Sequence, residues 1–185
     1  MRMDEPIRLL GECPVEALAA LLPAPDDAVW DVHGDRQQRF TVHTQTRSIV
    51  FLIGRPTPGM TALPEPERID YAPAALAEAA WACGEQVLRH FPGGRIQRLL
   101  LTELPAMTTI PPHKDGGIAM TDTWRCHVPV LTNPDVTFMI DERDYYFAPG
   151  RIYQIDNMRR HGVDNRGATR RVHLICNIAP AQSGA

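Results

Sequence analysis

The second half of the sequence is a succession of short strand-like segments separated by turns, with no helix between them. A TNPD turn at 132–135, a DERD turn at 141–144 and an APG turn at 148–150 divide apolar runs of five to eight residues. Parallel strands need long crossover connections, usually helices, so this spacing excludes a βαβ array and favours a sandwich or barrel. Eight segments are predicted to be strands: 29–32, 39–43, 48–53, 95–104, 125–131, 136–140, 151–155 and 171–178.

Two segments are predicted to be helices, Pro14–Leu22 and Asp70–Phe91. Apolar residues recur every three or four positions along the longer one, which is typical of a helix packed on a core. We interpret Asp70 as its N-cap, Pro73 as part of its first turn and the PGG sequence at 92–94 as its end. Neither helix carries a cofactor motif.

The 185 residues, 44% of them hydrophobic, suit one compact domain. We expect a single domain over 1–185, with an N-terminal helical extension at 1–25, a β core at 26–180 that includes the helix at 70–91, and a tail at 181–185. The four cysteines show no CxxC spacing, which predicts buried, reduced thiols rather than disulfides.

The charge balance restricts the partners of the chain. The formal net charge is −3, which argues against a nucleic-acid-binding domain. No apolar run approaches the ~20 residues of a membrane-spanning helix, and the opening MRMDEPIRLL does not resemble a signal peptide. We therefore expect a cytoplasmic protein whose partner is a small molecule or a peptide, and the sequence leaves its oligomeric state open.

The strongest local signal for chemistry is the sequence His113-Lys114-Asp115. In extended backbone, residues i and i+2 project from the same face, so the imidazole and the carboxylate can reach one metal ion while Lys114 points away. His161, just after the predicted strand 151–155, is the best second imidazole. Two histidines and one carboxylate leave positions open on an octahedral ion, as in non-haem Fe(II) oxygenases. Lys114, the only lysine, is expected to be dispensable for metal binding.

Further polar residues around this motif suit a small dicarboxylate. Arg171 lies ten residues after His161 in a predicted strand and could clamp a carboxylate. Arg125 and His127 share one strand face, and Thr102 offers a hydroxyl from the strand that leads towards His113. A 2-oxo dicarboxylate would chelate the metal at one end and meet an arginine at the other.

At these residues the sequence resembles the aspartyl/asparaginyl β-hydroxylase family of Fe(II)/2-oxoglutarate dioxygenases. The resemblance runs from about 95 to 180 and is most specific in PGRIYQIDNMRRHGVDNRGATRRVHLI, residues 149–175. It implies a mainly β, double-stranded β-helix fold of the jelly-roll or cupin type with one or two flanking helices. The animal aspartyl hydroxylase has glycine at the position of Asp115, so this chain is similar to the bacterial members with a full triad.

The resemblance also implies roles for individual residues. His113, Asp115 and His161 would hold Fe(II) as the catalytic centre. Four residues would bind 2-oxoglutarate: Arg171 at its C5 carboxylate with help from Thr102, and Arg125 and His127 near its C1 end. Oxygen would be the third reactant, with succinate and CO2 as products. For the substrate itself, Arg47 is our candidate to bind a carboxylate.

We therefore expect a dioxygenase that hydroxylates a C–H bond of an amino acid side chain. The resemblance favours aspartate, asparagine or a similarly small residue, free or in a peptide. Two alternatives remain at this point: a cupin-type metal isomerase or hydrolase, and a non-catalytic domain that binds or senses a dicarboxylate. Asp156 and Asn157 are expected to fix the turn before His161 or to orient a ligand, and the DERD run is expected to be a solvated hairpin tip.

Overall fold

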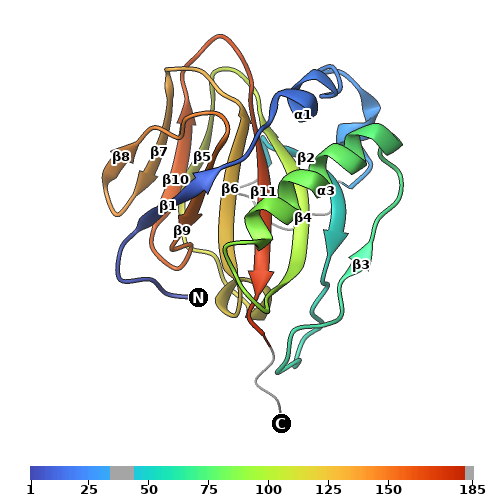
Figure 1. Ribbon diagram of the computed structural model, residues 1–185. Helices are drawn as coiled ribbons and strands as arrows, with labels where there is room; N and C mark the ends of the chain where they lie inside the picture. Colours follow the sequence, from blue (N-terminus) through green and yellow to red (C-terminus); the bar gives the residue numbers. More distant parts are fainter. Residues whose placement is uncertain (34–43, 182–185) are drawn as a thin grey trace.

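The structure, a computed structural model, describes residues 1–33 and 44–181 and consists mainly of two antiparallel β-sheets (Figure 1). The larger sheet contains, in spatial order, β1 (Ile7–Glu12), β9 (Arg151–Ile155), β6 (Trp124–Leu131), β11 (Arg171–Ala179), β4 (Arg95–Leu104), β2 (Arg47–Ile53) and β3 (Glu67–Arg68). The smaller sheet contains β5 (Thr108–His113), β10 (His161–Asn165), β7 (Val136–Ile140) and β8 (Arg143–Tyr145). The expected mainly β, cupin-like fold is confirmed.

The two faces of the large sheet serve different purposes. On β11 the even-numbered residues from Val172 to Ile178 join the apolar cluster under the helices. The odd-numbered Arg171, His173 and Asn177 project from the other face, towards the small sheet, because side chains alternate along a strand. A second apolar cluster, which includes Leu104 and Phe138, joins this inner face to the small sheet. Polar side chains are therefore gathered between the sheets.

Helices cover the outer face of the large sheet. The long helix α3 (Ala74–Leu88) packs against β4 and β11 (Figure 1), and α1 (Glu16–Ala20) lies against α3 and β6. Both helices are shorter than predicted. Pro73, not Asp70, occupies the N-cap position of α3, because its ψ of 133° is extended and helical geometry starts only at the next residue.

Several segments differ from the sequence-based expectation. Residues 29–32 were predicted to be a strand, but the 3-10 helix η1 (Ala28–Asp31) lies there, because the Asp27 carboxylate accepts a hydrogen bond from the Val29 backbone N–H at 2.9 Å and caps the turn. Residues 7–12, expected in a helical extension, pair with β9 at the edge of the large sheet. The predicted strand 39–43 lies outside the described residues.

Four strands in addition to β1 were not predicted: β3, β5, β8 and β10. Proline is usually confined to edge strands, yet Pro129 lies on β6, between β9 and β11. This proline is tolerated because the pairing with β9 covers only 125–127 and the pairing with β11 is irregular at its position. The DERD segment forms the exposed tip of the β7–β8 hairpin, as expected, with positive φ at Asp141 and Glu142.

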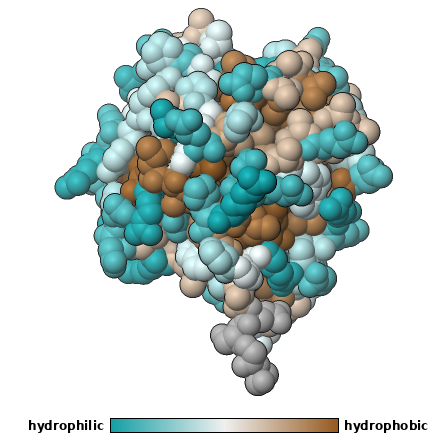
Figure 2. All heavy atoms as spheres, viewed as in Figure 1, coloured by the Kyte–Doolittle hydropathy of each residue, from teal (hydrophilic) through white to brown (hydrophobic). Residues whose placement is uncertain are grey.

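All four cysteines are buried and free, which confirms the expectation of thiols. Hydrophilic side chains are interspersed with hydrophobic ones on the face that carries α3 and β1 (Figure 2). Leu9 on the edge strand β1 is among the exposed apolar residues there. Within the described residues, no helix is long and apolar enough to cross a membrane.

A buried carboxylate ties the N-terminal region to the large sheet. Glu103 on β4 is fully buried and accepts from Arg47 at 2.5 Å and from Arg170 at 2.9 Å. The Arg170 side chain also donates to the Pro23 carbonyl at 2.7 Å and lies over the Trp30 ring. One carboxylate therefore pairs with two guanidinium groups on the outer face.

Replacing Glu103 with alanine should lower the free energy of unfolding by about 3 kcal/mol, since it leaves both arginines without their counter-charge in a mostly buried place. The control is Glu65→Ala, which removes a 3.0 Å pair with Arg95 in which the glutamate side chain is 88% exposed. That change should lower the stability by less than about 1 kcal/mol. Urea unfolding of the two variants measures the difference, and equal losses would contradict the assigned role.

Candidate functional site

The candidate site is built on the pairing of β5 with β10. In this ladder His161 lies opposite His113, and the two ring centroids are 4.5 Å apart. Gly162 makes the close approach possible: a Cβ on it would lie 2.8 Å from the Ile110 carbonyl oxygen and 3.1 Å from the Pro112 nitrogen. Any larger residue would push the two strands apart.

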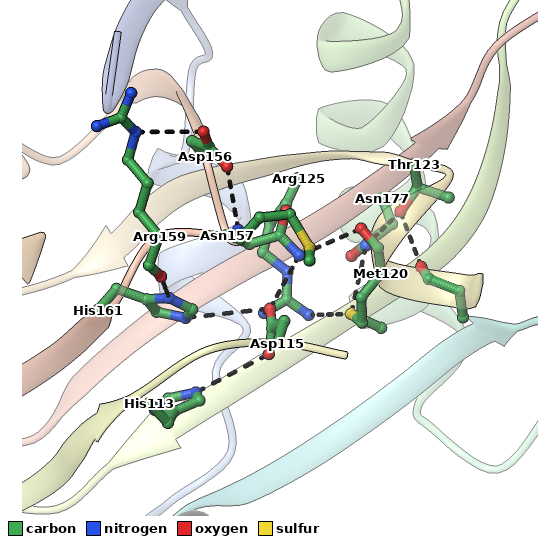
Figure 3. A network of polar contacts seen from close by, with 12 residues as sticks. His113, Asp115, Met120, Thr123, Arg125, Asp156, Asn157, Arg159, His161 and Asn177 are labelled. Atoms are coloured by element: carbon green, nitrogen blue, oxygen red, sulfur yellow. Dashed lines mark hydrogen bonds and ion pairs between the residues drawn. The ribbon is translucent and has the colours of Figure 1, made fainter. Parts of the chain in front are cut away.

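Asp115 joins the two histidines just beyond the end of β5. Its backbone N–H donates to the Asn157 carbonyl at 3.1 Å, which fixes this loop against the turn before β10. Asp115 Oδ1 lies 3.9 Å from His113 Nε2, and Oδ2 lies 4.0 Å from His161 Nε2. One ligand atom from each of the three residues lies within 4.8 Å of the others, so the arrangement fits a single metal ion (Figure 3).

The backbone orients both imidazole rings for metal binding. His113 Nδ1 lies 2.8 Å from the Pro111 carbonyl oxygen, and His161 Nδ1 lies 2.9 Å from that of Arg159. A carbonyl only accepts, so each Nδ1 carries the proton and each Nε2 lone pair faces Asp115. Burial also lowers the pKa of His161, which keeps this ring neutral and able to bind a metal.

The Asp115 carboxyl is held in its ionised form. Burial alone would raise its pKa, but the Arg125 guanidinium, His161 and the Asn157 amide hold the pKa well below its usual range. Arg125 donates to Oδ2 at 2.7 Å and Asn157 Nδ2 donates to the same oxygen at 3.1 Å (Figure 3). Asp156 accepts from the Met158 backbone N–H at 3.1 Å, within the turn before β10. Asn157 and Asp156 thus support the site as expected.

A second polar group lies on the inner face of the large sheet. Arg171, only 2% exposed, donates to His173 Nδ1 at 2.6 Å, and His127 Nδ1 lies 3.4 Å from the same atom. Because a guanidinium only donates, His173 Nδ1 accepts and His127 Nδ1 is the donor. Burial, with the positive charge of Arg171, holds the pKa of both histidines well below the usual value, so both rings are neutral.

These groups line one pocket between the sheets. Its lining includes His113 and His161 on the small sheet and Thr102, Arg125, His127 and Arg171 on the large one. Apolar walls, such as Ile110 and Phe138, complete it. A buried guanidinium and a cluster of metal-ligand atoms in one small pocket match a dicarboxylate that reaches a metal ion.

The structure therefore brings together every residue proposed for metal and cosubstrate, but it places Arg47 elsewhere. The Arg47 guanidinium binds Glu103 on the outer face, and the neighbouring Thr46 lines the pocket instead. Sequence reasoning favoured Arg47 over Thr46 for contact with the substrate, and it missed the contact of Met120 Sδ with Arg125 at 3.1 Å. Alternation along the chain indicates that Thr46 and Arg47 lie on opposite faces of the sheet. Which of the two faces the pocket depends on the pairing with the neighbouring strand.

Comparison with known proteins agrees with this geometry. The family model for aspartyl/asparaginyl beta-hydroxylase matches residues 77–180, which contain all three candidate metal ligands. The chain belongs to the aspartyl/asparaginyl β-hydroxylase family. No curated protein matches the sequence.

Among solved structures, the chain is similar to a 2OG-Fe(II) oxygenase family oxidoreductase from Burkholderia pseudomallei, with 12% identity and a TM-score of 0.52. The alignment covers 72% of this chain and 66% of that one, so the chain spans slightly less than two thirds of that relative. A predicted oxalate decarboxylase from Thermotoga maritima aligns with 16% identity and a TM-score of 0.37 over 51% of this chain and 73% of that one. A cupin domain from Bordetella pertussis aligns with 17% identity and a TM-score of 0.36 over 46% of this chain and 90% of that one.

Replacing His161 with alanine should abolish tight binding of a divalent metal such as Ni(II), because it removes one of three ligand atoms. Asn157→Ala should weaken metal binding by about 10- to 100-fold, since it releases a carboxylate that must stay oriented. Lys114→Ala is the matched control, because Lys114 lies between two ligands in the sequence but is exposed. This variant should bind the metal as the wild type does. Isothermal titration calorimetry measures all three, and tight binding by the His161 variant would exclude this site.

Replacing Gly162 with valine should also weaken metal binding by at least tenfold, because the new side chain displaces the β5 backbone that carries His113. Gly116→Ala is the control, since a Cβ there meets nothing within 4 Å. Circular dichroism should show that both variants remain folded. Unchanged metal affinity in the valine variant would show that the β5–β10 spacing does not position the ligands.

Proposed function

We propose that the protein is an Fe(II)- and 2-oxoglutarate-dependent dioxygenase that hydroxylates a C–H bond of an amino acid side chain. One observation carries the proposal: a His-Asp-His cluster and a deeply buried arginine line or adjoin the same pocket. The cluster suits a metal with positions left open, and the arginine suits the far carboxylate of a five-carbon 2-oxo acid.

In this proposal the residues divide the work. His113, Asp115 and His161 hold the iron, and Arg171 binds the C5 carboxylate of 2-oxoglutarate with Thr102 beside it. Arg125, which donates to Asp115, and His127 would bind near the C1 end. Iron and 2-oxoglutarate together supply the activation of oxygen, with succinate and CO2 as products. The protein binds, orients and charge-matches the reactants.

The geometry favours this function over the two alternatives. A cupin-type isomerase or hydrolase needs metal ligands but has no use for a buried Arg171 in the same pocket. A dicarboxylate sensor has no need of a complete metal triad with both Nε2 atoms turned to one point. Aspartate, asparagine or a similarly small residue, free or in a peptide, is the substrate class that family membership supports.

The direct test is a screen of amino acids and short peptides for substrate-stimulated formation of succinate by protein loaded with iron under anaerobic conditions. A hydroxylated product that appears in proportion to succinate would support the proposal. Binding of 2-oxoglutarate without any succinate, with or without candidate substrates, would favour the sensor instead. His113→Ala provides the blank, because it removes a ligand.

Replacing Arg171 with alanine should raise the 2-oxoglutarate concentration needed for half-maximal turnover about tenfold to hundredfold. The reason is that charge-assisted hydrogen bonds contribute roughly 1.5 to 3 kcal/mol each. The control is Arg166→Ala. Arg166 follows β10 directly, its side chain is 80% exposed, and it pairs with Asp164. Succinate formation over a range of 2-oxoglutarate concentrations measures the effect, and an unchanged requirement would remove Arg171 from this role.

A further inference from the structure

A third arginine belongs to the inner face of the large sheet and has no role in the scheme above. Arg98 lies on β4, four residues before the pocket-lining Thr102, and residues at even spacing share a face. The intervening odd residues, Leu99 and Leu101, belong to the outer apolar cluster. Arg98 therefore projects towards the side of the sheet on which the pocket lies.

The strand register places Arg98 in line with Arg125. Asn177 on β11 is paired with Arg98 on one side and with Arg125 on the other. Since neighbouring strands are about 4.8 Å apart, the backbones of the two arginines are roughly 10 Å apart across the sheet. Arg125 reaches Asp115, so this row of residues marks the metal end of the pocket.

Among the residues that the structure describes, the Arg98 side chain has no acidic partner. Within residues 1–33 and 44–181 it makes no hydrogen bond or ion pair, although it is partly buried. Burial and the nearby positive charges of Arg125 and Arg55 lower its pKa to about 10, whereas the Asp115 carboxylate acts in the opposite direction. Asp115 already binds Arg125 and Asn157. A partly desolvated guanidinium among like charges favours an incoming anion.

There is room for a ligand at this end. Asp115 is followed by Gly116 and Gly117, and a Cβ at either position would meet no atom of the described residues within 4 Å. The backbone beside the carboxylate is therefore open. A molecule that approaches this stretch of backbone would lie next to the metal ligands.

We propose that Arg98 binds a carboxylate of the substrate, so that the enzyme selects an anionic substrate over its neutral amide. This inference rests on the proposed function, in which Arg171 and Arg125 are occupied by the two ends of 2-oxoglutarate. It also replaces Arg47 as the substrate arginine, because Arg47 is held by Glu103 on the opposite face. The carboxylate can belong to the side chain or to the α-carbon of the substrate.

The test uses four probes that differ only in charge: L-aspartate, its α-amide, L-asparagine and L-asparagine amide. Each is titrated by calorimetry into protein loaded with Zn(II) and 2-oxoglutarate, which binds without turnover. We expect the wild type to bind a probe that carries the recognised carboxylate at least tenfold more tightly than the probe in which that carboxylate is replaced by an amide. Arg98→Gln should reduce that preference to less than threefold, and Arg98→Lys should keep part of it.

The pattern of the four affinities identifies the source of the carboxylate. Preference for aspartate and its α-amide indicates the side-chain group, whereas preference for aspartate and asparagine indicates the α-carboxylate. Arg95→Gln is the matched control, because Arg95 lies on the same strand and pairs with the exposed Glu65. It should retain the full preference of the wild type.

Three results would overturn the inference: a wild type without preference or without binding of any probe, a preference that survives in Arg98→Gln, or an equal loss of 2-oxoglutarate affinity in that variant. The last would make Arg98 part of the cosubstrate site. Failure of the proposed function is distinct, since it would appear as absent 2-oxoglutarate binding or absent succinate formation in the wild type, neither of which depends on Arg98. Intact 2-oxoglutarate binding without carboxylate preference rejects only the role of Arg98.

Discussion

The pairing of β10 with β5 is the constraint on which the site depends. It sets His161 opposite His113, and it needs the missing side chain of Gly162. The supports of the site follow from the same pairing, because Asp115 continues from the end of β5 and Asn157 precedes β10. Their hydrogen bonds, from the Asp115 N–H to the Asn157 carbonyl and from the Asn157 amide to the Asp115 carboxylate, join the two loops. One local pairing thus determines both the ligands and their orientation.

The large sheet contributes charge to a site whose metal ligands come from the small sheet and the loop after it. Its outer face is sealed by α3 and an apolar cluster, so apolar residues on β11 and β6 occupy alternate positions there. The remaining positions are free to carry Arg171, His173, Arg125 and His127 towards the pocket. Burial of apolar groups on one face, at about 25 cal/mol per Å² of apolar surface, offsets the placement of cations on the other. Helix α3 therefore supports the site from the opposite face of the sheet.

Much of this arrangement could be predicted from the sequence where the signal is local. Alternation through His113 and Asp115, and the turns that divide the second half of the chain, depend on neighbouring residues only. The strands β5 and β10 were missed because their sequences, TTIPPH and HGVDN, show no apolar alternation. They form because their backbones pair with each other. Arg47 was placed wrongly for a related reason: alternation shows which residues share a face, but the buried Glu103 across the ladder decides which face it is.

The charges of the pocket connect the metal, the cosubstrate and the substrate. Asp115 and Arg125 neutralise each other, so a bound divalent ion would add two positive charges to a poorly solvated space. In the proposed function, a 2-oxoglutarate dianion would balance the ion, so each would favour the binding of the other. Arg171 and Arg98 then remain as cations on the inner face, and among the described residues Asp115 is the carboxylate that acts on Arg98. A substrate that brings a negative charge reduces this excess, whereas a neutral one leaves it, so electrostatics alone favours an anionic substrate once metal and cosubstrate are in place.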